Sequence, residues 1–288
     1  MEADKRILVT GATGQQGGAV ARSLLARGQQ VRVMTRSSEK ARHLAQRGAE
    51  VVRGDFEDQE SLKEAIRGVD GVFIMGTPFE KGPGAEVEQG KAIVTACWKY
   101  GDPHIVYTSV CAADRGTGIP HFESKARVES LIKGSGVDYT ILRPVWFMEN
   151  FASPWFYPSI EKGVIATPVR PDRRLQMISL FDIGEFAADA FLNPEEFRRK
   201  EIDLAGDDLT MTEIAAHISC AMNREIRYET IPDEKSETAV GEDFALMYRW
   251  FNRQGYQVDI AEMQNRWRIP LTSFSHWLGR SELYRKAA

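Results

Sequence analysis

The chain contains 288 residues, of which 43% are hydrophobic and 27% charged, and its formal net charge is -4. This composition predicts a globular protein with one large domain or two unequal ones, and it excludes an intrinsically disordered chain. The slightly acidic balance argues against a nucleic-acid partner. Since no apolar run reaches the roughly 18 residues that suggest a membrane span, a membrane protein is also disfavoured.

The first residues enter a strand-like run without the apolar core of a signal peptide, so we expect a cytoplasmic protein. The three cysteines, Cys97, Cys111 and Cys220, lack CxxC spacing, which favours reduced thiols over disulfides or a zinc site. The five histidines are scattered, and no two have the spacing of metal ligands on one helical face. We therefore expect no metal site.

Strand-like and amphipathic segments alternate through the first half of the chain. The expected strands are 6–10, 30–35, 50–53, 71–75, 104–109 and 139–144, and the expected helices are about 16–28, 38–48, 60–67, 85–100 and 121–134. Short β-branched runs between helices indicate βαβ units, and hence a doubly wound parallel sheet covered by helices on both faces. We therefore expect an α/β fold with right-handed crossovers.

The pattern changes after Pro144, because six of the thirteen residues 146–158 are aromatic and a loop rich in proline and arginine follows. We place a first domain at 1–155 and a smaller α+β domain at 156–288, with the segment 176–193 packing back on the first. The second domain is expected to contain a helix that begins at the capping box Thr210–Glu213 and an aromatic helix at 244–251.

The first expected strand ends in TGATGQQGG, which places Gly11, Gly14 and Gly17 in GxxGxxG spacing directly before a helix. Glycines at these positions permit a tight turn, let the backbone approach a pyrophosphate and allow the helix to lie close to the strand. The spacing alone is weak evidence. A strand before it, a helix after it and a second strand within 25 residues make it specific for a dinucleotide site.

The end of the second strand distinguishes NAD from NADP, because an acidic residue there binds the ribose hydroxyls whereas a basic one accepts the additional phosphate. This chain has TRSSEK, with Arg36, Ser37 and Lys40 and no acid at the strand end. Arg36 can present its planar guanidinium to a phosphate, and the hydroxyl and ammonium groups can add donors. NADP(H) is therefore the favoured cofactor, with a solvated cationic turn as the alternative.

The third and fourth expected strands end in residues that suit the same ligand. Asp55 and Phe56 follow the third strand, where they could bond and cover an adenine ring, and Gly76 and Thr77 follow the fourth, where the backbone can pass close to the cofactor. Both pairs lie at carboxyl ends of parallel strands, which is where ligands bind in doubly wound sheets. Each pair alone is explained equally well as ordinary residues of a loop. Together with Gly11, the two pairs describe one cleft.

The segment HFESK, residues 121–125, has the spacing of tyrosine and lysine in the short-chain dehydrogenase pattern, but His121 stands where the tyrosine would be. This spacing puts His121 and Lys125 on one helical face. Lys125 could bind the nicotinamide ribose and stabilise a developing oxyanion, or it could be an exposed lysine. His121 could deliver a proton or cap the helix start. Ser109 resembles the dehydrogenase serine in position, or its hydroxyl serves the backbone.

Aromatic residues gather after the sixth strand and in the helix at 244–251. Those that would suit a flat aromatic substrate are Trp146, Phe151, Trp155, Tyr157 and Trp250. Ordinary core or domain-interface packing is the competing interpretation. Hydride transfer to a quinone or a cationic dye needs no enzyme base, because such molecules carry their own electron sink. The absence of the dehydrogenase tyrosine at position 121 therefore does not exclude reduction of such a substrate.

In this order, the motifs TGATGQQGG, TRSSEK, HFESK and LRPVWFMEN resemble the NmrA-like family of atypical short-chain dehydrogenases over nearly the full length. The resemblance implies a Rossmann domain that binds NADP(H) and a smaller C-terminal domain that forms one wall of a cleft. By motif it assigns to cofactor binding Gly11, Ala12, Thr13, Gly14, Gln15, Gln16, Gly17, Arg36, Ser37, Lys40, Asp55, Phe56, Gly76, Thr77, Pro78, Lys91, Lys125, Pro144, Phe147 and Asn150.

The resemblance implies two kinds of function, because the family contains NAD(P)H-dependent reductases as well as cofactor-sensing regulators that act through protein partners. We favour an NADPH-dependent reductase of a flat conjugated molecule, and the missing tyrosine leaves the NADP(H)-sensing regulator as the alternative. We expect a small-molecule substrate and no membrane contact, with a homodimer or a regulatory protein partner left open. Direct DNA binding is disfavoured, because residues 211–226 lack the small turn residue and the basic second helix of a helix-turn-helix.

Overall fold

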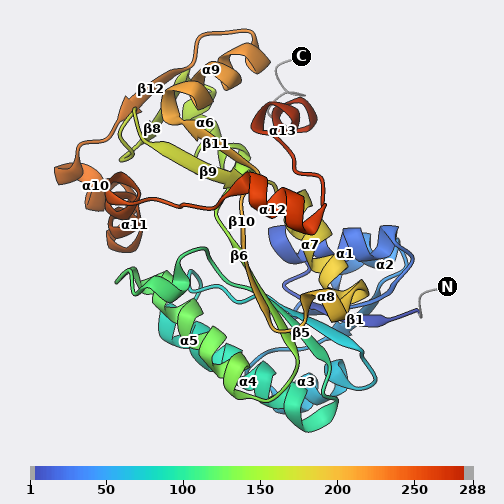
Figure 1. Cartoon of the computed structure of the whole chain (residues 1–288). Coiled ribbons are helices and arrows are strands. Elements are labelled where there is room, and N and C mark those ends of the chain that lie inside the picture. The colour runs from blue at the N-terminus through green and yellow to red at the C-terminus, as the bar shows by residue number, and fades with distance from the viewer. Residues whose placement is uncertain (1–3, 282–288) are drawn as a thin grey trace. The chain divides into compact units, whose positions relative to one another are not determined.

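The computed structural model describes residues 4–281, which divide into two compact units (Figure 1). Unit 1 comprises residues 4–116, 120–143 and 183–203, and unit 2 comprises residues 117–119, 144–182 and 204–281. The chain leaves unit 1 after residue 143, earlier than the predicted boundary at 155, because a small sheet of unit 2 begins at Trp146. It returns to unit 1 at residue 183, so only the second part of the predicted 176–193 segment lies there.

The strands of unit 1 form a seven-stranded sheet within the described residues, in the order β10-β6-β5-β4-β1-β2-β3. They are β1 (Arg6–Thr10), β2 (Gln30–Thr35), β3 (Glu50–Arg53), β4 (Gly71–Ile74), β5 (His104–Thr108), β6 (Tyr139–Pro144) and β10 (Lys200–Leu204). Each pairing from β6 through β5, β4, β1 and β2 to β3 is parallel, which confirms the predicted doubly wound α/β sheet. β10 extends this sheet beside β6, although its residues were predicted to lie in the second domain.

The helices of unit 1 connect these strands in the predicted alternation. They are α1 (Gln15–Ala26), α2 (Arg42–Ala45), α3 (Gln59–Ile66), α4 (Pro83–Tyr100), α5 (Pro120–Gly134), most of α7 (Leu180–Leu192) and α8 (Pro194–Phe197), with 3-10 turns η1 (Ser38–Ala41) and η2 (Ala113–Arg115). The predicted helix over 38–48 was wrong in extent, because its first residues form the 3-10 turn and the α-helix ends at Ala45.

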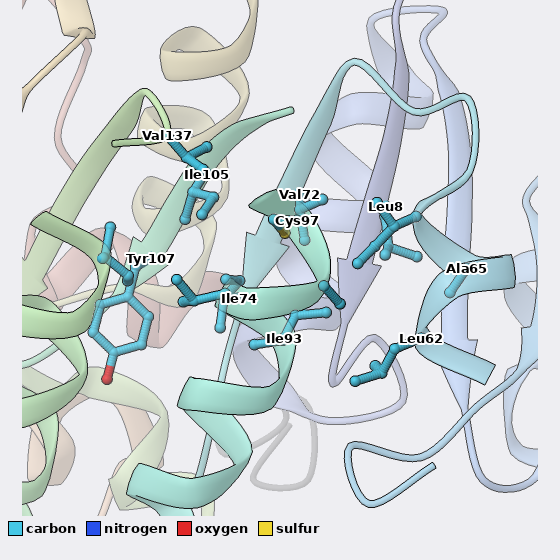
Figure 2. Packing of buried hydrophobic residues seen from close by; sticks show 14 of the residues in the cluster. Leu8, Leu62, Ala65, Val72, Ile74, Ile93, Cys97, Ile105, Tyr107 and Val137 are labelled. Atoms are coloured by element: carbon cyan, nitrogen blue, oxygen red, sulfur yellow. The ribbon is translucent and has the colours of Figure 1, made fainter. Parts of the chain in front are cut away.

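Apolar residues on both faces of the sheet explain why helices cover both. On one face, Leu8, Val72 and Ile105 of neighbouring strands pack with Leu62 of α3 and Ile93 of α4 (Figure 2). Burying an aliphatic side chain of this size contributes about 1.5–3 kcal/mol. On the other face, Gly184 of α7 lies against α1, where an added Cβ would be 2.9 Å from the carbonyl oxygen of Ala19.

A buried ionic network joins four elements of unit 1. The guanidinium of Arg143 on β6 donates to both carboxylate oxygens of Glu129 on α5, at 2.9 and 2.6 Å. It also donates to Asp114 of η2 at 2.8 Å and to Glu201 of β10. These carboxylates raise the pKa of Arg143, although burial opposes the shift. Because Arg143 is 5% exposed, the cation depends on these partners, and through them it holds α5 on the sheet.

His104, the first residue of β5, is held neutral in the folded chain. Its Nε2 lies 2.9 Å from the hydroxyl of Thr140, which itself donates to the carbonyl oxygen of Phe197, so Nε2 is the protonated nitrogen. Burial lowers the pKa of His104 from 6.5 to about 4. Between these values the unfolded chain binds more protons than the folded chain. The contribution of neutral His104 to the free energy of unfolding is therefore fully present above about pH 6.5. It is lost as the pH falls through about 4.

We expect the free energy of unfolding to fall by up to about 3 kcal/mol from this group between pH 6.5 and pH 4. Urea denaturation at a series of pH values should show this slope in the wild-type chain and a shallower one in His104→Gln. The exposed His43 supplies the control, because His43→Gln should retain the wild-type slope. An unchanged slope in His104→Gln would contradict the assignment.

Unit 2 contains two small sheets among its described residues, with strand orders β11-β9-β7 and β12-β8. Its strands are β7 (Trp146–Phe147), β8 (Val164–Thr167), β9 (Arg174–Ile178), β11 (Asp207–Thr210) and β12 (Arg227–Thr230). Its helices are η3 (Met148–Ala152), α6 (Tyr157–Ile160), α9 (Met211–Met222), α10 (Asp233–Val240), α11 (Glu242–Arg253), α12 (Ile260–Trp267) and α13 (Phe274–Arg280). Helices and short strands are mixed in this unit, as the predicted α+β domain requires.

The expected capping box is confirmed at the start of α9. The hydroxyl of Thr210 accepts from the amide of Glu213 at 3.2 Å, and the Glu213 carboxylate accepts from the amide of Thr210 at 2.8 Å, which is the predicted capping box. The helix ends at Asn223, whose φ of 50° reverses the chain into β12. Because a strand follows α9 in the described chain, a helix-turn-helix is excluded at residues 211–226.

Within residues 4–281, no helix combines the length and apolar character that crossing a bilayer demands.

Candidate functional site

Three of the residues 11–17 are glycines, and they form a cradle between β1 and α1. Gly11 has a φ of +61°, which favours glycine, and Gly14 precedes the helix without a capping side chain from the described residues. A Cβ on Gly17 would lie 2.5 Å from the carbonyl carbon and oxygen of Gly11 and 2.6 Å from the carbonyl oxygen of Thr10. The first turn of α1 therefore lies directly against the end of β1, and the amides of a first helical turn are groups that can bind an anion.

Two threonines that sequence reasoning missed hold this cradle on the sheet. The hydroxyl of Thr10 donates to the carbonyl oxygen of Phe73 at 3.0 Å and accepts from the amide of Met75 at 2.9 Å, which ties β1 to β4. The hydroxyl of Thr108 on β5 donates to the side-chain oxygen of Gln16 at 2.6 Å, which ties α1 to the sheet. Hydroxyls at strand ends are common, so only the strand order reveals that these two support the turn.

The structure places Arg36 directly after β2 with its side chain 60% exposed. Its Nη2 lies 2.9 Å from a carboxylate oxygen of Glu80, and this hydrogen bond raises the pKa of Arg36. Exposed ion pairs contribute little to stability, so Arg36 can exchange this carboxylate for a phosphate at small cost. Ser37 is half-buried and Lys40 is exposed beside it, so the predicted donors are accessible on one turn.

Residues predicted at the ends of the third and fourth strands, Phe56 for the adenine and Gly76 for close backbone approach, lie together. Phe56 and Gly76 line one small cavity of about 10 Å³ at the carboxyl ends of β3 and β4. The carboxylate of Asp55 accepts from the amide of Glu57 at 3.1 Å, so it shapes its own turn. The hydroxyl of Thr77 accepts from the amide of Phe79 at 3.3 Å in the same way.

Two residues assigned by the family motif differ in exposure. Pro78 is buried after β4, whereas Lys91 is exposed on α4. Their roles in cofactor binding stay predictions.

On α5, the structure holds the lysine of HFESK in a buried ion pair. The ammonium of Lys125 donates to a carboxylate oxygen of Glu86 at 2.7 Å and to the carbonyl oxygen of Gly76 at 3.4 Å. Glu86 lies in the first turn of α4 and is 1% exposed. Sequence reasoning missed Glu86, because a lone glutamate in the pattern of an amphipathic helix predicts a solvent-facing side chain. The interpretation of Lys125 as an exposed lysine is wrong.

His121 and Ser109 are both buried in unit 1. His121 is the second residue of α5 and is 7% exposed, with its ring 5.7 Å from that of Phe79 and 4.8 Å from that of Phe122. Ser109 follows β5, and its hydroxyl has no hydrogen-bond partner in residues 4–281. A buried donor without a partner is costly, which distinguishes Ser109 from a hydroxyl that serves the backbone. Proton delivery by His121 stays a prediction.

The remaining predicted residues belong to unit 2 and lie in or next to β7, η3, α6 and α11 along the chain. Pro144 is buried before β7, and Phe147 and Asn150 are half-buried. The aromatic residues predicted to line a substrate pocket are Trp146, Phe151, Trp155, Tyr157 and Trp250. They differ in exposure. Phe151 and Trp250 are buried in aromatic packing, whereas Trp155 is 79% exposed. A substrate role for these residues stays a prediction.

Throughout the described chain, no group of three or more histidine, cysteine, aspartate or glutamate side chains is arranged to hold a metal ion. Cys97 and Cys111 are buried free thiols, and burial raises the pKa of Cys97 to about 12, so this thiol is not a nucleophile at neutral pH.

Comparison with known proteins places this arrangement in a family. The NmrA-like family model matches residues 3–278. The chain is 32% identical over 254 residues to the NmrA-like family domain-containing oxidoreductase FrzB of Cladobotryum sp, covering 78% of this chain and 76% of that protein. It is 28% identical over 235 residues to quinone oxidoreductase 2 of Escherichia coli K12, covering 79% and 78%.

A solved structure agrees with this match over almost the whole length. The structure of Citrobacter sp. triphenylmethane reductase complexed with NADP(H) superposes with a TM-score of 0.83 at 25% identity, covering 98% of this chain and all of that one. The family match, the sequence relatives and the shared fold all extend over both units of the chain. The chain therefore belongs to the NmrA-like family.

Proposed function

We propose that the chain is an NADPH-dependent oxidoreductase that transfers hydride to a flat conjugated small molecule of the quinone, dye or enone type. The observation that carries the proposal is the glycine cradle, in which a Cβ on Gly17 would lie 2.6 Å from the carbonyl oxygen of Thr10, so that the first turn of α1 lies against the end of β1, as in turns that bind a pyrophosphate. The reductase activities named for quinone oxidoreductase 2 and triphenylmethane reductase support the class of reaction.

The residues present fit the proposed cofactor at both ends. Backbone groups from Gly11 to Gly17 would hold the pyrophosphate, and Arg36 with Lys40 would hold the phosphate that distinguishes NADP from NAD. Lys125 would bind the hydroxyls of the nicotinamide ribose. The bound cofactor would supply the hydride, so the chain would contribute alignment and charge rather than a nucleophile.

The residues around Lys125 favour acceptors with their own electron sink. The ammonium would stabilise negative charge that develops on a substrate oxygen. The dehydrogenase tyrosine is absent, and His121 is packed between aromatic rings instead of being exposed at the surface. A quinone or a cationic dye accepts hydride without a strong acid, whereas a simple ketone needs one. We therefore place conjugated acceptors above ketones in the expected order of activity.

The proposal is tested by following NADPH absorbance with purified protein and a panel of quinones, dyes, enones and simple ketones. We expect oxidation of NADPH with at least one conjugated acceptor and slower oxidation with every ketone. A tight NADPH complex without turnover across the panel would overturn the reductase and support the second candidate, an NADP(H)-sensing regulator that acts through a protein partner. The observation that favours this candidate is the histidine in place of the dehydrogenase tyrosine.

Cofactor choice gives a separate prediction at Arg36. In Arg36→Asp, we expect the dissociation constant for NADPH to rise roughly 10- to 100-fold, because one charge-assisted hydrogen bond to phosphate is lost and a carboxylate is added. The constant for NADH should change by less than about three-fold. Fluorescence titration with both cofactors measures this, with the exposed Arg47→Asp as the control. Equal weakening of NADPH and NADH would show that Arg36 does not bind the phosphate.

A further inference from the structure

We propose that Glu86 is a positioning residue, which holds the Lys125 ammonium at the carboxyl end of β4 so that it meets the nicotinamide half of the cofactor. The inference rests on the proposed function, since it concerns how the same site binds NADP(H). Glu86 would not touch the reacting atoms. It would act through Lys125, and its effect would therefore be limited to ligands that reach Lys125.

The first argument is the burial of charge. Glu86 is 1% exposed, and a carboxylate taken out of water is stabilised only by close partners that compensate for the lost hydration. The two partners are consecutive residues of α5. Lys125 donates from its ammonium at 2.7 Å and Ser124 donates from its hydroxyl at 2.5 Å, to different carboxylate oxygens. The carboxylate is thus fixed from two directions, and in turn it fixes the direction of the lysine.

The second argument is the shape of the backbone around the pair. A Cβ on Gly76 would lie 3.2 Å from Cγ of Glu86 and 3.3 Å from its Oε1, so the glutamate stem packs against this residue. The carbonyl oxygen of Gly76 is also the second acceptor of Lys125, at 3.4 Å. Gly76 was predicted to let the cofactor approach the backbone. Its lack of a side chain also leaves room for Glu86. Gly76, Glu86 and Lys125 therefore form one cluster at the end of β4.

The third argument is the number of donors on the ammonium. A lysine ammonium carries three N–H groups, and two of them are used by Glu86 and Gly76 among the described residues. One N–H group therefore stays available for a ligand. A lysine side chain has four rotatable bonds, and holding it in one place before the ligand arrives removes the entropy cost from the binding step. Glu86 thus pre-organises a flexible cation.

A purely structural role for Glu86 makes a different prediction. The Ser124 contact joins α4 to α5, so loss of the carboxylate could loosen the packing of both helices. Such loosening would weaken every ligand of unit 1, whether or not it reaches Lys125. Adenosine 2′,5′-bisphosphate separates the two roles, because it carries the adenine and the phosphate expected at Arg36 but lacks the nicotinamide half.

The test is isothermal titration calorimetry of NADP+ and adenosine 2′,5′-bisphosphate with the full chain. In Glu86→Gln, we expect the dissociation constant for NADP+ to rise about 10-fold, as for a lost charge-assisted interaction, while that for the bisphosphate stays within about two-fold. Lys125→Met should show the same selectivity. In the Lys125→Met background, Glu86→Gln should add less than about two-fold, because its effect passes through the lysine.

The control is Glu88→Gln, the same substitution at an exposed carboxylate of α4. It should leave both dissociation constants within about two-fold of the wild type. Unchanged or tighter NADP+ binding in Glu86→Gln, equal weakening of both ligands, or an undiminished effect without Lys125 would each overturn the positioning role and leave the proposed function intact. A wild-type chain that binds neither ligand would overturn the proposed function, and the inference with it.

Discussion

Replacing Gly17 with alanine is expected to raise the dissociation constant for NADP(H) by roughly 100-fold or more. The added methyl group would lie 2.5 Å from the carbonyl carbon and oxygen of Gly11 and 2.6 Å from the carbonyl oxygen of Thr10. All three atoms belong to the backbone, so no side-chain rotation can relieve the contact. The start of α1 must move away from β1, and the amides that would bind the pyrophosphate move with it.

Gly84→Ala supplies the matched control for this substitution. Gly84 lies near the start of α4, and apart from its chain neighbours and the nearby backbone of its own helix, no atom of the described chain comes within 4 Å of a Cβ added there. Alanine at this position should leave cofactor affinity unchanged and leave stability equal or slightly higher. Fluorescence titration with NADPH measures affinity, and urea denaturation shows whether each variant is folded. Wild-type affinity in folded Gly17→Ala would contradict the placement of the pyrophosphate.

Replacing Arg143 with methionine is expected to lower the free energy of unfolding by about 3–5 kcal/mol. The substitution removes a cation that donates to Glu129, Asp114 and Glu201, and it leaves the 1%-exposed carboxylate of Glu129 without its main partner. A methionine of similar length fills part of the volume, so the loss comes from the uncompensated charge rather than from a cavity. Urea denaturation at pH 7 measures the difference.

The exposed pair of Arg42 and Glu39 is the control for Arg143. Their side chains are 68% and 71% exposed, so Arg42→Met should change the free energy of unfolding by less than about 0.5 kcal/mol. Equal losses in the two variants would mean that burial does not distinguish these ion pairs. A loss below about 1 kcal/mol in Arg143→Met would contradict the role of the network in holding α5 on the sheet.

Local patterns were sufficient to predict most of unit 1. β1 and α1 were predicted correctly because an apolar run, three spaced glycines and an amphipathic run each act within a few residues. The same reasoning placed His121 and Lys125 on one face of a helix, since residues four positions apart on a helix share a face whatever surrounds them. Arg36 was placed after β2 for a similar reason, because the end of a strand is visible in the sequence.

Features that depend on distant segments were not predictable in this way. Glu86 becomes a partner of Lys125 only once α4 and α5 pack together, and nothing near residue 86 indicates its burial. Similarly, β10 was assigned to the second domain because its sequence shows a strand but not which sheet it joins. The support of Gln16 by Thr108 requires β5 to lie near the start of α1, although 92 positions separate the two residues.

A crystal structure of the chain grown with NADP+ tests the central claim most directly. We predict that the pyrophosphate binds the amides between Gly11 and Gly17, with the additional phosphate at Arg36 and a nicotinamide ribose hydroxyl bonded to Lys125. A dinucleotide bound elsewhere, or one whose pyrophosphate does not touch the glycine turn, would contradict the account.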